Sequence, residues 1–194
     1  MSRIGRKPVP LPQGVTASVS GTTIAVKGPK GELTRTLHPE LSVAVEGSEV
    51  RLKRPTDSSK HRALHGLSRT LVANMVEGVT KGYEKTLEIQ GVGYKAETKP
   101  YGLNIIVGYS HSVEFKAPPG IKLTADQPTV VKVSGSDKEL VGQTAARIRA
   151  VRPPQVYTGK GIRYMNEQVR RKAGKATGRR KRCCAARPTS TTPS

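Results

Sequence analysis

The first third of the chain alternates apolar and polar residues in short segments, each bounded by turn residues. A period of two is typical of strands that bury one face. The alternation predicts strands at 15–20, 22–27 and 32–37, and a hairpin of 43–45 with 50–53. Turns are expected at Gly21, at Gly28–Gly31 and at 46–49, so neighbouring strands should pair in antiparallel fashion.

After Pro55 the apolar spacing lengthens to that of a helix. One apolar stripe is predicted at positions i, i+3, i+7 and i+11, formed by Leu64, Leu67, Leu71 and Met75. Asp57 or Ser58 should cap the start of this helix. Gly78 or Gly82 should end it, because glycine readily adopts the left-handed conformation that follows many helices.

The second half of the chain repeats this order. The predicted strands are 85–90, 93–98, 103–108, 112–116 and 130–133. Ser136 and Glu139 have the spacing of a capping box and predict the start of a second helix. Its expected apolar face contains Leu140, Thr144 and Ile148, with Val141 and Ala145 beside them.

Strands followed by one helix, twice, about 77 to 80 residues apart, indicate a tandem duplication. The predicted fold class is α+β, with two tandem similar domains. Each domain is a small, mostly antiparallel sheet packed against one helix, and a basic C-terminal extension follows. We expect the first domain at 1–82, the second at 83–175, and a basic, disordered tail at 176–194.

The charge of the chain points to a polyanionic partner. Among 194 residues, 34 are Lys or Arg and 14 are Asp or Glu, for a net charge of +20. Residues 147–187 hold 14 of the basic side chains and a single acid, Glu167. Only 35% of residues are hydrophobic, which argues against a large enzyme with a deep apolar pocket. No apolar run reaches membrane-spanning length, and the N-terminus is unlike a secretory signal, so we expect a cytoplasmic protein.

Four patterns that sometimes carry chemistry find little support here. Gly91–Ala96 fits G-x-G-x-x-A, but a strand end and a turn follow it where a nucleotide site requires a helix. Gly159–Gly161 lacks the Ser or Thr of a phosphate-binding loop. His61 and His65 lack a third metal ligand and are expected to face solvent or RNA. The adjacent cysteines at 183–184 also lack further ligands, so we predict no metal, no cofactor and no catalysis.

The segment from Arg147 onward is the candidate RNA-binding site. Arginines at the end of the second helix can meet phosphates, and Pro153 ends that helix. Gly159 and Gly161 would let the backbone approach a phosphate closely. Tyr157 and Tyr164 either stack on bases or pack the loop. The predicted contacts are Arg147, Arg149, Arg152, Tyr157, Gly159, Lys160, Gly161, Arg163, Tyr164, Arg170, Arg171, Lys172 and Lys175.

At these residues the sequence resembles the bacterial L-six family of large-subunit ribosomal proteins. The resemblance runs from residue 1 to about 178 and is carried by Pro153–Tyr164, Arg170–Lys175, Met1–Val9, Val26–Gly31, Gly82–Tyr83 and Gly91–Ala96. Two departures stand out. The family's usual Glu-Pro-Tyr-Lys is Gln155–Thr158 here, which removes a cation at Thr158, and residues 179–194 run past the family's usual end.

The resemblance implies a structural constituent of the large ribosomal subunit with two duplicated α+β domains. It implies binding to 23S rRNA near the sarcin–ricin loop and the stalk base, chiefly through the second domain and the C-terminal tail. Neighbouring large-subunit proteins near the stalk base would be partners, and translation factors would dock nearby.

Three other functions are weaker readings of the same residues. A free architectural protein of nucleic acids would fit the charge, but the tail lacks a helical reader or an apolar wedge. An RNA-modifying enzyme would need a catalytic constellation, which the sequence does not show. A membrane-surface role would need large apolar residues within the basic stretch.

Overall fold

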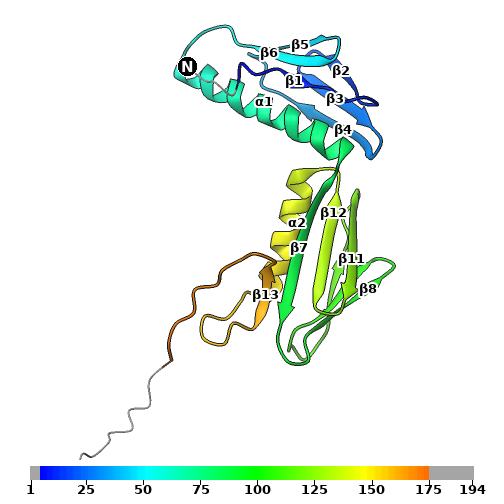
Figure 1. Cartoon of the computed structure of the whole chain (residues 1–194), viewed down its shortest axis with the longest axis vertical. Coiled ribbons are helices and arrows are strands. Elements are labelled where there is room, and N and C mark those ends of the chain that lie inside the picture. Colours follow the sequence, from blue (N-terminus) through cyan, green and yellow to red (C-terminus); the bar gives the residue numbers. More distant parts are fainter. Residues whose placement is uncertain (1–4, 175–194) are drawn as a thin grey trace, which may run out of the picture.

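A computed structural model of the chain describes residues 5–174, which form two α+β domains (Figure 1). The first domain contains β1 (Val9–Pro10), β2 (Thr16–Ser20), β3 (Thr23–Gly28), β4 (Gly31–Thr36), β5 (Ser42–Glu46), β6 (Glu49–Lys53) and α1 (Ser59–Thr80). Its strands form two three-stranded sheets, ordered β1-β6-β5 and β2-β3-β4, and every pairing is antiparallel.

The second domain repeats this plan and adds a strand. It contains β7 (Tyr83–Gln90), β8 (Lys95–Lys99), β9 (Gly102–Ile106), β10 (Val113–Lys116), β11 (Ile121–Gln127), β12 (Val130–Gly135), α2 (Lys138–Val151) and β13 (Gly161–Tyr164). The sheets are ordered β11-β12-β7-β13 and β10-β9-β8, again antiparallel. The predicted α+β class with two duplicated domains is therefore confirmed.

The helix α1 begins and ends at predicted residues but buries a different face. The Ser58 hydroxyl accepts the His61 N–H at 3.2 Å, and Gly82 follows the helix with φ +78°. The buried residues are His65, Ser68, Val72, Met75, Val76, Gly78 and Val79. The predicted stripe is wrong except at Met75, because Leu67 is 57% exposed and Leu64 and Leu71 are only half-buried.

The N-cap and the buried face of α2 also differ slightly from the prediction. Asp137, rather than Ser136, is the N-cap, because its carboxylate accepts the Glu139 N–H at 2.9 Å. The capping-box prediction is therefore wrong by one residue. Thr144 and Ile148 are buried as expected, together with Val141 and Ala145, whereas Leu140 is 38% exposed.

The two histidines of α1 do not face solvent or RNA as predicted. His65 is 3% exposed, and its ring nitrogens lie 3.1 Å from the Leu52 carbonyl oxygen and 3.1 Å from the Arg54 guanidinium. His61 pairs with the Glu40 carboxylate at 2.8 Å. Both rings therefore tie the helix to the segments around β5 and β6, which is a structural role.

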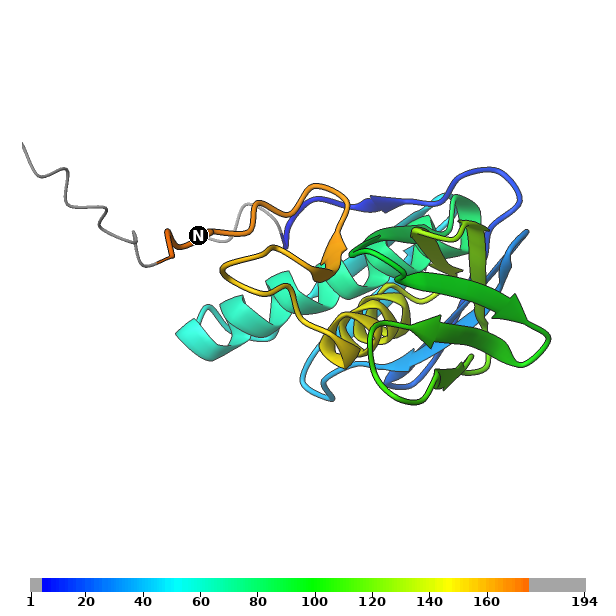
Figure 2. The same cartoon turned by 90° about the horizontal axis from the view of Figure 1, so that it is seen from below.

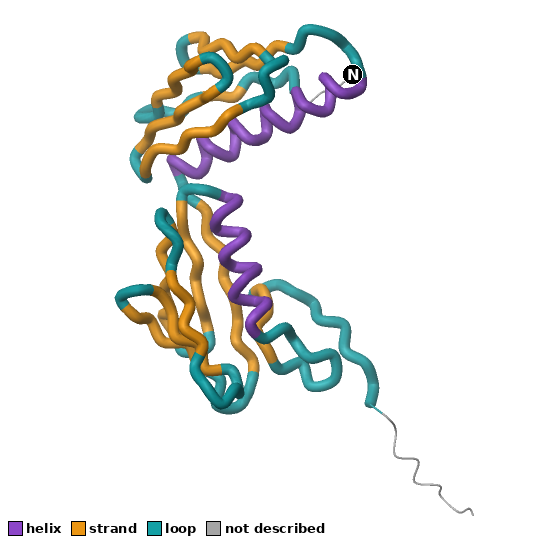
Figure 3. Tube along the Cα trace, turned by 180° about the vertical axis from the view of Figure 1, so that it is seen from behind, coloured by secondary structure: helices purple, strands orange, loops and turns teal. Residues whose placement is uncertain are grey.

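Each domain has its own hydrophobic core, and the two cores share no residue. The domains meet at the end of α1, and both helices line the same concave side of the molecule (Figure 3). Gly78 allows this contact, because a Cβ there would collide with the Ser136 carbonyl oxygen. An ion pair between Arg35 and Glu139 at 2.5 Å also crosses the junction.

Candidate nucleic-acid interface

The basic segment after α2 is anchored to the core of the second domain by β13. Ile162 is fully buried among the core residues, and its N–H donates to the Arg152 carbonyl at 2.8 Å. The strand β13 pairs with β7, with Ile162 opposite Ile89. Figure 2 shows this segment extending from the domain on the side away from β8 and β9. The strand β13 was not predicted, because this segment was expected to form a loop.

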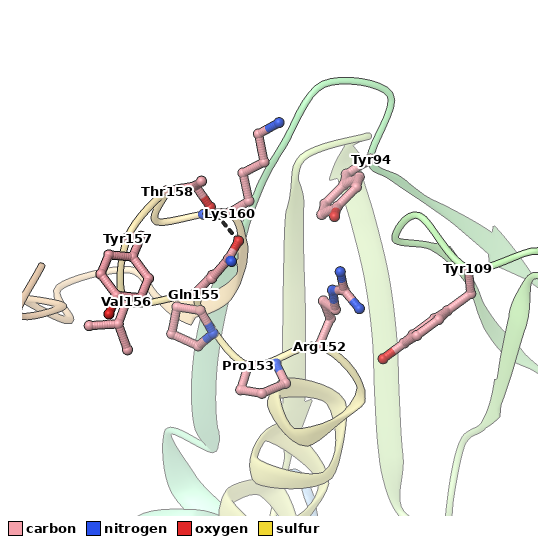
Figure 4. A pocket seen from close by; sticks show the side chains of 10 residues that line it. Tyr94, Tyr109, Arg152, Pro153, Gln155, Val156, Tyr157, Thr158 and Lys160 are labelled. Atoms are coloured by element: carbon pink, nitrogen blue, oxygen red, sulfur yellow. Dashed lines mark hydrogen bonds between the residues drawn. The ribbon is translucent and has the colours of Figure 1, made fainter. Parts of the chain in front are cut away.

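Between Arg152 and β13 the chain forms a tight loop closed by its own hydrogen bonds. The Gln155 N–H donates to the Lys160 carbonyl at 2.9 Å, and the Gly159 N–H donates to the Gln155 carbonyl at 2.8 Å. The Thr158 hydroxyl donates to the Gln155 side-chain oxygen at 2.6 Å (Figure 4). The loop therefore holds Lys160 in an exposed position at its rim.

Both glycines of this loop have a positive φ that disfavours other residues, and Gly161 also lies close to backbone atoms. Gly161 has φ +137°, and a Cβ there would lie 2.7 Å from the Pro153 carbonyl oxygen. Gly159 has φ +72°, and a Cβ there would lie 2.6 Å from the Arg171 guanidinium. Both glycines are buried, and the Gly159 N–H is already bonded. In the structure these glycines close the loop, and their approach to a phosphate stays a prediction.

Two of the predicted phosphate-binding arginines are held by carboxylates. Arg149 pairs with Glu167, donating from Nε at 2.9 Å, and Arg163 donates to Glu88 at 2.8 and 3.1 Å. The hydrogen bond with Glu167 raises the pKa of Arg149, and the same bond lowers the pKa of Glu167. Because Glu167 also accepts the Tyr164 N–H at 3.1 Å, these pairs fix the segment against the sheet.

Removing the Glu167 charge should weaken the fold most at neutral pH. The carboxylate has a lowered pKa, so its pairing stabilises the protein above the ordinary value of 4.5 and is lost as the pH falls below it. We expect Glu167→Gln to cost about 1 kcal/mol of unfolding free energy at pH 7, since the pair is partly exposed. The difference from wild type should be smaller at about pH 3 than at pH 7, because the carboxylate becomes protonated as the pH falls through its lowered pKa.

Urea unfolding at both pH values measures this difference. Glu97→Gln is the control, because Glu97 forms an exposed pair with Lys95 and should change the unfolding free energy little. A difference between wild type and Glu167→Gln that grows as the pH falls would contradict the assignment.

Apart from the half-buried Arg152, the other cations of the segment are exposed and available to a partner. They are Arg147, Lys160, Arg170, Arg171 and Lys172. Within residues 5–174, none of these five has an ion-pair partner. The Lys172 N–H donates to the Val156 carbonyl at 3.1 Å, which brings the three later cations back beside the loop. Lys175 and the predicted tail at 176–194 lie outside the described residues.

The two tyrosines of the segment take different positions. Tyr164 is half-buried, and the Arg149 guanidinium lies 5.9 Å from its ring centre. Tyr157 is 60% exposed. Of the two roles left open by the sequence, Tyr164 therefore packs the segment, whereas Tyr157 presents its ring to solvent.

Sequence reasoning missed two aromatic residues that stand beside this segment. Tyr94 and Tyr109 line an open pocket of about 810 Å³ together with Arg152 and the loop at 153–160 (Figure 4). Tyr94 follows the Gly91–Gly93 pattern, and Tyr109 follows β9. Only the tertiary pairing of these distant segments brings their rings to the site.

The described residues contain neither a metal-binding cluster nor a membrane-spanning helix. No group of three or more His, Cys, Asp or Glu side chains gathers anywhere between residues 5 and 174. Neither described helix has the length and apolar character needed to cross a membrane.

Known proteins match this chain over most of its length. The family model of ribosomal protein L6 matches residues 11–82 and 90–165. The chain belongs to the ribosomal protein L6 family. As a ribosomal protein it has a structural role and is not an enzyme, which confirms the prediction made from the sequence.

Individual members of the family are similar to the chain at more than half of the aligned positions. The large ribosomal subunit protein uL6 of Gemmatimonas aurantiaca is 58% identical over 92% of this chain and 100% of its own length. The protein of the same name from Carboxydothermus hydrogenoformans is 54% identical over 94% and 100%. That of Synechococcus sp. (strain JA-3-3Ab) is 57% identical over 91% and 97%.

The structure shows what replaces the first and last residues of the family's usual Glu-Pro-Tyr-Lys motif in this chain. Gln155 and Thr158 hold the first and last positions of that motif, and their side chains bond each other. A neutral hydrogen bond therefore closes the loop where the family pattern has two opposite charges. The exposed cation at the loop rim is Lys160.

Proposed function

We propose that this protein is a structural constituent of the large ribosomal subunit that binds 23S rRNA near the sarcin–ricin loop and the stalk base. There it would support the region in which translation factors dock, beside neighbouring large-subunit proteins. The name of the relatives, large ribosomal subunit protein, supports the choice of subunit. The position on the rRNA follows from the family resemblance.

One observation carries the proposal: five exposed cations without ion-pair partners gather on one anchored segment. Its only acid, Glu167, is already paired with Arg149. The internal pairs therefore set the shape of the segment and leave the five cations for phosphates. Arginine binds phosphate oxygens in pairs, and lysine acts as a point charge.

We propose different roles for the two domains in rRNA binding. We propose that the first domain spans 1–82, and that the second, at 83–175, carries the main rRNA contact. The junction at Gly78 and the pair of Arg35 with Glu139 would keep the first domain at a fixed angle while the second is bound. A rigid two-domain body suits the bracing of separate rRNA helices.

Hydroxyl-radical footprinting on 23S rRNA tests the position. The full chain should protect nucleotides around the sarcin–ricin loop and the stalk base. A variant with the five cations changed to glutamine should lose this protection. Protection elsewhere on the rRNA, with none at these helices, would contradict the proposed position.

A further inference from the structure

Three flat side chains, Tyr94, Tyr109 and Arg152, line one wall of the pocket beside the binding loop (Figure 4). We propose that this aromatic shelf binds one unstacked nucleotide of the bound RNA. The inference rests on the proposed rRNA binding and adds a contact to a base, beyond the contacts of cations with phosphates.

The Tyr94 ring packs closely against the backbone at two glycines. A Cβ at Gly91 would lie 2.5 Å from the ring, and a Cβ at Gly108 would lie 3.0 Å from it. Both glycines have positive φ, +157° and +76°, so side chains are disfavoured there by backbone conformation as well as by space. The glycines therefore leave room for the ring to lie against the backbone at the pocket wall.

Tyr109 and Arg152 are positioned by separate contacts. The Tyr109 hydroxyl donates to the Val151 carbonyl at 2.9 Å, and the ring stacks with His111 at 5.9 Å between centres. The Arg152 guanidinium lies 5.0 Å from the centre of the Tyr109 ring. Arg152 has no carboxylate partner among the described side chains, unlike the other two arginines that flank the loop.

The side chains of Tyr94, Tyr109 and Arg152 together have the chemistry needed to bind a nucleotide. Aromatic rings and a guanidinium plane stack on any base, because every base has a π-face. Lys160 at the rim and Arg152 itself supply charge for the attached phosphate. The pocket volume of about 810 Å³ lies in the range of sites that enclose a small ligand. A base within a duplex is already stacked, so the occupant belongs to a loop or bulge.

Replacing the Tyr94 ring in the full chain tests the shelf. The probe is 23S rRNA transcribed in vitro, and the dissociation constant is measured at several salt concentrations. We expect Tyr94→Leu to weaken binding by about 5-fold to 150-fold, the range seen when a stacking aromatic residue is removed. The dependence on salt should keep its slope, since stacking neutralises no phosphate.

Two further substitutions separate stacking from other effects. Tyr94→Phe keeps the ring and should keep the wild-type affinity. Tyr101→Leu removes an exposed tyrosine of the same domain that does not line the pocket, and should also leave the affinity unchanged. If Tyr94→Leu binds the rRNA with wild-type affinity, the proposed stacking site is wrong. It is also wrong if the loss of affinity comes with a reduced salt slope.

Ultraviolet cross-linking of the wild-type complex tests nucleotide binding at the aromatic shelf without any substitution, so it applies even if Tyr94→Leu does not fold. The shelf predicts a cross-linked nucleotide on a peptide that contains Tyr94 or Tyr109. If rRNA binding stays salt-dependent and no cross-link reaches these peptides, the shelf is wrong and the proposed function stands. If the wild-type chain shows no salt-dependent binding to the rRNA, both are wrong.

Discussion

Neutralising the five exposed cations should abolish most of the affinity for 23S rRNA at low salt. The variant carries Arg147→Gln, Lys160→Gln, Arg170→Gln, Arg171→Gln and Lys172→Gln. About six neutralised phosphates give the wild-type protein a slope of log K against log salt of about −4 to −5. Losing five contacts reduces the magnitude of that slope by about 3.5 to 4.5. Because counterion release contributes most at low salt, affinity near 0.1 M should fall by about a thousandfold or more.

The control removes the same charge from other parts of the surface. It changes five exposed lysines to glutamine, namely Lys53, Lys60, Lys99, Lys116 and Lys122, none of which has an ion pair within the described residues. Filter binding over a salt series measures both variants. Similar losses of slope in the two would mean that total charge, and not this segment, drives binding.

Gly161→Ala should both destabilise the second domain and displace the binding loop. The residue has φ +137°, and its new Cβ would meet the Pro153 carbonyl oxygen at 2.7 Å and the Pro154 Cα at 2.8 Å. Strain at such a position costs about 1 to 3 kcal/mol, and the neighbouring atoms belong to backbone that cannot simply rotate away. We expect the unfolding free energy to fall by at least this amount. Lys160 would move with the strand, so rRNA affinity should fall as well.

Gly142→Ala is the matched control for this substitution. Gly142 lies in α2 of the same domain, and a Cβ there would have no neighbour within 4 Å. Alanine should therefore stabilise the helix by about 0.5 to 1 kcal/mol, with no change in rRNA affinity. Thermal and urea unfolding compare the two variants. Equal stability of Gly161→Ala and wild type would show that closure of the loop at Gly161 is not needed for the stability of the domain.

The sequence alone reveals the fold wherever the determining signal is local. The alternation of apolar and polar residues predicts the strands from β2 to β10, although not their exact ends. The longer spacing of apolar residues that is typical of helices predicts α1 and α2. The four-residue strand β13 could not be predicted in this way, because the strand with which it pairs, β7, lies more than 70 residues earlier. The two residues of β1 are too few to show a period.

The buried face of α1 illustrates another limit of a periodic pattern. This helix carries leucines on one side and Val72, Val76 and Val79 on another, so two apolar stripes compete. The sheet beneath the helix decides between them, and only tertiary structure shows where that sheet lies. The exposure of Leu67 follows from this choice.

The binding segment was found from its charge, but its internal organisation was not. Arg149 and Arg163 are indistinguishable in sequence from the cations that remain exposed. Glu88, the partner of Arg163, is 75 residues away, and no local rule connects the two. The described structure therefore separates the cations that shape the segment from those that can reach a phosphate.

Sucrose-gradient sedimentation of a cell lysate tests the central proposal most directly. Fractions are probed for this chain before and after a high-salt wash and after ribonuclease treatment. We expect the chain to migrate with the large ribosomal subunit, to stay with it through a moderate salt wash, and to leave those fractions when the RNA is digested. A chain that stays at the top of the gradient, or follows DNA after ribonuclease treatment, would contradict it.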